Sequence, residues 1–181
     1  MIGRLLLRAK FAAALLSVSA VAAAGFPSGS AVAEETSFLQ RFSGSWSGSG
    51  SVQRKAEEGA NRVRCKVKGS SSQTALSMNG TCRAALVFTR QIGVEVHADP
   101  GTGRYAGTYT GASIGPARVS GRRQGDTVTL TITWPKPVNG DTKATMTIRN
   151  DGSGRLSIAV TDKMPDGRQV QTTNLTFAKG A

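Results

Sequence analysis

Apolar and polar residues alternate with a period of two along much of the chain. In the clearest case, residues 127–134, Val128, Leu130, Ile132 and Trp134 interleave with four threonines. This period predicts a strand with one buried face. The same alternation predicts further strands around residues 92–96, 144–148 and 156–160.

Turn-forming pairs separate these segments. They are Asp99-Pro100-Gly101, Gly125-Asp126, Asn139-Gly140-Asp141, Asn150-Asp151-Gly152 and Asp166-Gly167. Asn-Gly and Asp-Gly pairs supply the positive φ angles of tight hairpins, so neighbouring strands should pair antiparallel in chain order. The sequence predicts an all-β protein, an antiparallel up-and-down β-barrel of about eight to ten strands, because closure removes exposed sheet edges. A β-sandwich is the alternative.

A helical pattern in the predicted domain occurs only from Thr36 to Phe42, where Phe38, Leu39 and Phe42 share one face. Thr36 or Ser37 would cap it. We therefore expect a short helix of one or two turns before the first strand.

The first 33 residues have the pattern of a signal peptide. Basic residues near the start precede an apolar run from Phe11 to Ala24, and small residues lead to Ala33. The apolar run is shorter than the roughly 20 residues that cross a membrane as a helix. We expect cleavage after Ala33, with a cut after Ala24 as the alternative, and export to the periplasm or beyond. Residues 34–181 would form a single domain without a transmembrane segment.

Two cysteines, Cys65 and Cys82, would remain in an oxidising compartment. An even count there indicates a disulfide. Closing a loop of 17 residues should stabilise the fold by roughly 3 kcal/mol. A metal or redox pair would need closer spacing or histidine neighbours, and neither is present.

The chain is strongly basic even without the leader. The leader holds 3 of the 23 basic residues and none of the 11 acidic ones, so 20 basic and 11 acidic residues remain, a net charge of +9. This charge favours anionic partners such as an envelope lipid or glycan, and export argues against nucleic acid. The alternative is that the charge only maintains solubility.

The cations concentrate on the outer face of the predicted strand at residues 62–68. If both cysteines face inward, Arg83 of the next predicted strand lies on the outer face beside these cations. We call the resulting set the basic face: Arg62, Arg64, Lys66, Lys68 and Arg83. Like charges this close suggest a partner, although a solvated face that prevents association is the alternative.

Residues for catalysis are scarce. The only histidine, His97, shares a strand face with Glu95, a pair that more often lies on a solvated face than at an active site. No serine lies in a G-x-S-x-G turn. We expect a protein that is not an enzyme, with no catalytic residue, metal or cofactor.

Small residues on inward faces would leave space inside the barrel. Such a barrel either fills with side chains or holds one small apolar ligand. Tyr105 and Tyr109 share a strand face and are candidates to line the mouth of a cavity, together with Trp134 in its lining. The alternative is that the tyrosines are ordinary half-buried strand residues.

The segment from Phe42 to Gly50 reads F-S-G-S-W-S-G-S-G directly after the predicted helix. Its G-x-W, Gly44 to Trp46, resembles the start of the calycin β-barrels, which include lipocalins and avidin-like proteins. The wider G-x-W-x-G-x-G also resembles bacterial barrels related to nitrobindin. The resemblance implies that Trp46 plugs one barrel end, while Gly48 and Gly50 let the sheet coil tightly.

Two features of those families have no clear counterpart here. Lipocalins carry a late arginine that packs on the tryptophan, and no arginine of this chain is clearly placed for that contact. Nitrobindin-like barrels bind haem through a late histidine, whereas His97 lies in mid-sequence. Haem is therefore not expected.

The chain also resembles small periplasmic inhibitors of secreted metalloproteases, calycin-like barrels with G-x-W and one disulfide between early strands. That resemblance implies that Glu34 to Arg41 would enter a protease cleft. The expected function is an exported, non-enzymatic binding protein for a small apolar ligand inside the barrel or an anionic envelope component on the basic face. A protease inhibitor or other protein-binding module is the alternative.

Overall fold

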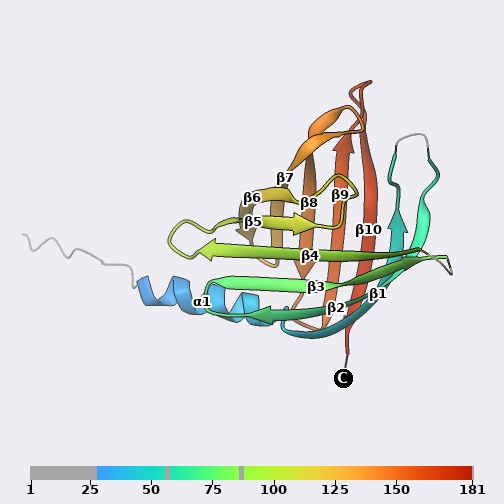
Figure 1. The fold of residues 1–181 in the computed structure, drawn as a ribbon. Coiled ribbons are helices and arrows are strands. Elements are labelled where there is room, and N and C mark those ends of the chain that lie inside the picture. The colour runs from blue at the N-terminus through green and yellow to red at the C-terminus, as the bar shows by residue number, and fades with distance from the viewer. Residues whose placement is uncertain (1–27, 56–57, 86–87, 181) are drawn as a thin grey trace, which may run out of the picture.

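Ten strands follow one helix in the computed structural model, which describes residues 28–55, 58–85 and 88–180 (Figure 1). The elements, in chain order, are α1 (Ser28–Gln40), β1 (Gly44–Val52), β2 (Asn61–Ser71), β3 (Ala75–Ala84), β4 (Phe88–Asp99), β5 (Arg104–Thr110), β6 (Ala117–Gln124), β7 (Thr127–Val138), β8 (Asp141–Asn150), β9 (Arg155–Lys163) and β10 (Gln169–Lys179). Within these residues no helix has the length and apolar character to span a bilayer.

The strands form one closed antiparallel barrel. Each strand pairs with the next along the chain, and β1 also pairs with β10. Short hairpins enforce this order, as between β7 and β8, where Asn139 and Gly140 have φ values of 52° and 87° and Val138 pairs with Asp141. The predicted up-and-down barrel is confirmed, and the alternative of a β-sandwich is wrong.

The helix is longer than expected. It begins at Ser28 rather than Thr36 and ends at Gln40, so it includes the last residues of the expected leader. Residues 29–33 of α1 are exposed and show no apolar period, so no pattern in the sequence predicts this part of the helix. The other 27 residues of that leader lie outside the described residues.

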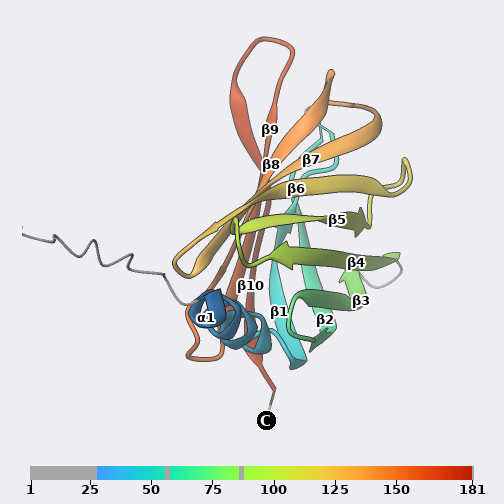
Figure 2. The same cartoon turned by 90° about the vertical axis from the view of Figure 1, so that its left-hand side faces the viewer.

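The helix covers one end of the barrel, which we call the helix end. Phe38, Leu39 and Phe42 are each 1% exposed, and the indole N–H of Trp46 donates to the carbonyl oxygen of Phe42 over 2.8 Å. Figure 2 shows α1 at the opposite end from the β7–β8 and β9–β10 hairpins. We call that opposite end the hairpin end.

Inward-facing side chains at alternate strand positions form the core. On β2, Val63, Cys65 and Val67 are buried while their neighbours are exposed. Cys65 lies opposite Cys82 of β3 in the strand register, and the two form a disulfide. The predicted disulfide is confirmed.

Candidate functional site

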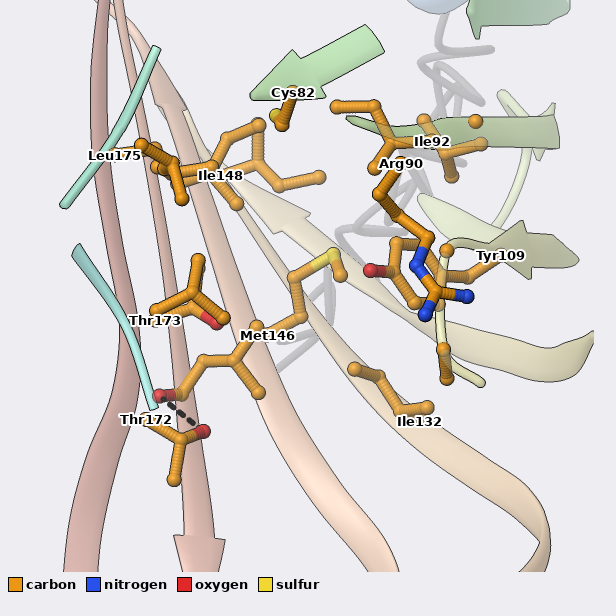
Figure 3. Close-up of a pocket in the computed structure, with 18 of the residues that line it drawn as sticks. Cys82, Arg90, Ile92, Tyr109, Ile132, Met146, Ile148, Thr172, Thr173 and Leu175 are labelled. Atoms are coloured by element: carbon orange, nitrogen blue, oxygen red, sulfur yellow. Dashed lines mark hydrogen bonds between the residues drawn. The ribbon is translucent and has the colours of Figure 1, made fainter. Parts of the chain in front are cut away.

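A cavity of about 720 Å³ lies inside the barrel. Phe38 and Phe42 line it at the helix end. Most of its walls are aliphatic, with side chains from strands on all sides, and Figure 3 shows part of this lining. Examples are Val96, Leu130, Met146, Ile148 and Leu175. Volumes of this size and lining are typical of small-molecule sites.

The three aromatic residues considered for the cavity all line it, at different depths. Tyr105 was a candidate for the mouth of the cavity. It instead lies under α1 and is only 2% exposed. Tyr109 and Trp134 lie further towards the hairpin end, with their rings edge to face and their centroids 6.0 Å apart. Tyr105 has a different position because β5 begins at the helix end, at Arg104.

A buried polar network attaches α1 to the barrel. Glu35 is 3% exposed, and its carboxylate accepts hydrogen bonds from the Tyr105 hydroxyl and from Nε of Arg123 at 3.0 Å. The Arg123 guanidinium also pairs with exposed Glu34 at 2.7 Å and lies 4.8 Å from the centroid of the Phe38 ring. Burial, reinforced by the carboxylate of Glu35, raises the pKa of Tyr105 well above its usual value.

A second contact at this end joins Arg41, the residue after α1, to the β6–β7 turn. Nη1 of Arg41 lies 2.6 Å from the Asp126 carboxylate, and the Arg41 guanidinium lies 5.4 Å from the Phe38 ring centroid. The pairing of Glu35 with Arg123 was not predicted from the sequence. Only the acidic pair Glu34-Glu35 beside the predicted helix hinted at such contacts.

The G-x-W segment lies at the start of β1, at the helix end of the barrel. Trp46 is buried beneath the helix end, and Gly44 opens β1 with a φ of 109°. A Cβ at Gly48 would lie 2.4 Å from the Phe177 ring, and one at Gly50 would lie 1.9 Å from a backbone oxygen of β10. These glycines therefore permit the close approach of β1 to β10.

The cation that packs on Trp46 is a lysine. Nζ of Lys179 lies 5.6 Å from the indole ring, and Lys179 faces Trp46 in the β1–β10 register. No cation on Trp46 was predicted from the sequence, where an arginine was the residue type expected for this contact. Its position near the end of β10 was the available signal.

Near the hairpin end the apolar wall is interrupted by polar groups. Asp162 is 4% exposed and accepts a hydrogen bond from the Thr172 hydroxyl. Burial raises the pKa of Asp162, and the side chains of Thr172 and Trp134 oppose that rise. Arg90 and Tyr109 also line the cavity and lie side by side in Figure 3.

The basic face lies on the outside of the barrel. All five of its residues are exposed, and Arg64 lies directly opposite Arg83 in the β2–β3 register. Across β1, serines face the cations of β2. Among the residues that the structure describes, none of the five has an ion pair with a carboxylate.

His97 and Glu95 are exposed on the outer face of β4, away from the cavity. The described part of the chain contains no cluster of three or more histidine, cysteine, aspartate or glutamate residues that would hold a metal ion.

Comparison with known proteins identifies the fold alone. No protein-family model matches the chain, and no curated protein sequence is significantly similar to it. Among solved structures, that of Rv2717c from M. tuberculosis is similar, with a TM-score of 0.64 and 14% identity over 81% of this chain and 98% of that chain. The protein is therefore an all-β, ten-stranded antiparallel barrel with a distant structural neighbour in Rv2717c.

Proposed function

We propose that this protein binds a small, largely apolar ligand inside its barrel. The observation that carries the proposal is the cavity of about 720 Å³ with its predominantly aliphatic lining. Side chains around an apolar space lack contact partners on one side, and a ligand of matching character would supply these contacts. The proposed role is binding, without chemistry on the ligand.

We also propose that the chain is a calycin-like barrel of the bacterial envelope. The G-x-W segment at the head of β1 and the lysine on Trp46 support the first statement. The leader pattern and the disulfide support export. Cleavage after Ala33 would remove the exposed positions 29–33 of α1 and would retain Glu35, Phe38 and Leu39.

The proposal is tested by filling the cavity from one strand. Ile92 and Gln91 are neighbours on β4, but Ile92 lines the cavity whereas Gln91 is exposed. The Ile92→Trp variant should bind a hydrophobic fluorescent dye at least about tenfold more weakly, because one tenfold step needs only about 1.4 kcal/mol. The Gln91→Trp variant adds the same side chain outside the barrel and should bind like the unmodified protein.

Two results would contradict the proposal. One is a dye that does not bind the unmodified protein, and the other is equal loss of binding in both variants. Circular dichroism of each variant would verify that the barrel is intact. A native mass spectrum of the protein purified from its host envelope would then give the mass of the natural ligand.

The basic face supports a second candidate function, binding of an anionic envelope lipid or glycan. The supporting observation is that Arg64 and Arg83 face each other without a carboxylate partner among the described residues. Attraction between exposed charges is screened by salt, so binding to vesicles rich in anionic lipid should weaken steeply as salt increases. Binding that is insensitive to salt would exclude this function.

The burial of the amino-terminal segment argues against the alternative function of a protease inhibitor. The segment that would enter a protease cleft, Glu34 to Arg41, contains Glu35, Phe38 and Leu39, which are buried against the barrel. Inhibition by that segment would require α1 to detach from the barrel end.

A further inference from the structure

We infer that the ligand of the cavity carries one anionic head group, which pairs with Arg90 at the mouth of the cavity. This inference rests on the proposed function and specifies the chemical class of the ligand as an apolar molecule that ends in an anion.

The first step concerns the face of β4 on which Arg90 lies. Arg90 is directly opposite Cys82 in the β3–β4 register, and directly opposed residues place their side chains on the same face of a sheet. Cys82 is 9% exposed and lines the cavity. Arg90 therefore occupies an inward position of the barrel, and it lines the cavity although it is also exposed to solvent.

The second step concerns the depth of Arg90 in the barrel. β4 begins at the end of the barrel away from α1 and runs towards the helix end (Figure 1). Phe88 and Arg90, at its start, are exposed. The next inward positions, Ile92 and Val94, are half-buried, and Val96 is buried. All five side chains line the cavity, so this row leads from a cation at the solvent boundary to an aliphatic interior.

The third step concerns the charged partners of Arg90. Two other cations of the cavity wall, Arg54 and Lys55, pair with Glu58 at 3.1 and 3.5 Å. Arg90 has no ion pair with any carboxylate of the described residues. Asp162 is the one acidic residue in the described part of the cavity wall. Burial raises its pKa, and Arg90 is not among the groups that shift it. The cation of Arg90 is therefore available to a ligand.

The fourth step concerns the direction of the Arg90 side chain. Figure 3 shows it beside Tyr109, among the side chains that line the cavity. Burial raises the pKa of Tyr109, and the positive charge of Arg90 opposes that rise. The guanidinium is thus close enough to the cavity wall to act on a group that lies in it.

The fifth step concerns which chemical group complements Arg90. A guanidinium donates hydrogen bonds and accepts none, and it pairs with an anionic oxygen group through two parallel hydrogen bonds. An ammonium head group would be repelled, and a neutral one would gain only weaker hydrogen bonds. Burial of an isolated charge is costly. At the mouth the head group stays in contact with water while the apolar chain fills the interior, so this cost is avoided.

The site is tested with decanoate and decanamide, each titrated at neutral pH and low salt against the dye-loaded protein. Both have a planar head group and the same number of heavy atoms, but only decanoate is charged. Without a cation at the mouth, decanamide would bind at least as well, because an ionised group is harder to remove from water. With Arg90 as its partner, decanoate should bind at least about fivefold more tightly. This comparison uses the unmodified protein and does not depend on the folding of a variant.

Two variants then locate the discrimination. Arg90→Met should reduce the preference for decanoate to less than about twofold, because the chain that packs on the wall remains and only the charge is lost. Arg83→Met is the matched control. It removes the same charge from the exposed position next to Cys82 on β3, on the outer face, and should preserve the preference.

Each outcome bears on one of the two proposals. Equal binding of decanoate and decanamide to the unmodified protein, or tighter binding of decanamide, would overturn the inference and leave the proposed function standing. An equal loss of preference in the two variants would also overturn the inference, because the net charge would then be responsible. Failure of both compounds to displace the dye would overturn both proposals.

Discussion

Removal of the Glu35 carboxylate is expected to destabilise the barrel far more than removal of its neighbour. In the Glu35→Ala variant the Tyr105 hydroxyl loses its partner. Arg123 retains two polar partners, exposed Glu34 and the Gly125 carbonyl oxygen at 3.0 Å, besides its contact with the Phe38 ring. The side chains of Glu35 and Arg123 are 4% and 14% exposed. Breaking so buried a pair from one side costs about 3–5 kcal/mol. We expect Glu35→Ala to lower the free energy of unfolding by about 3 kcal/mol, at the lower end of this range, because Arg123 keeps two polar partners.

Glu34→Ala is the matched control. Glu34 pairs with the same arginine, but its side chain is 70% exposed, so its removal should cost at most about 1 kcal/mol. The free energies of unfolding would be measured by denaturant titration with circular dichroism at neutral pH. Hydrogen exchange of the α1 amides would show whether the loss is localised at the helix end.

The reasoning would be refuted by equal losses in the two variants, or by a loss below about 1 kcal/mol for Glu35→Ala. A double variant, Glu35→Leu with Arg123→Met, provides a further check. Replacing both partners by apolar side chains of similar size leaves no buried charge, so this variant should be more stable than Glu35→Ala.

Three further predictions concern stability. Replacing Cys65 and Cys82 with alanine should lower the free energy of unfolding by roughly 3 kcal/mol; a denaturation midpoint unchanged by reductant would contradict this. Burial raises the pKa of Asp162 above its ordinary 3.8. Between the pKa of the unfolded state and that of the folded state, the folded protein therefore holds a proton that the unfolded chain releases. The free energy of unfolding falls as pH increases through this interval, because the buried carboxyl group must then ionise. The stability of Asp162→Asn relative to the unmodified protein should therefore be greater at pH ~7 than at pH ~3, and a difference that is constant across a pH series would refute it. Gly50→Ala would place a Cβ 1.9 Å from a backbone oxygen and should cost more than about 2 kcal/mol, whereas Gly59→Ala, with no atom within 4 Å, should be near neutral in the same titration.

The strands and their order along the barrel could be predicted from the sequence. The alternation at residues 127–134 predicts which side chains of β7 face inward, and Asn139-Gly140 predicts its hairpin with β8. The pairing of Cys65 with Cys82 followed from two cysteines on inward faces. These features depend on local periodicity, turn conformation and residue count, so they can be read without knowledge of distant contacts.

The contacts at the two barrel ends could not be predicted, because they join residues that are distant in the sequence. Glu35 and Arg123 are 88 residues apart, and no local pattern identifies them as partners. Asp162 meets Thr172 through a bulge, which shifts the inward positions of β10 and is invisible to simple alternation. The volume of the cavity depends on how side chains from many strands pack together inside the closed barrel, so no local part of the sequence specifies it.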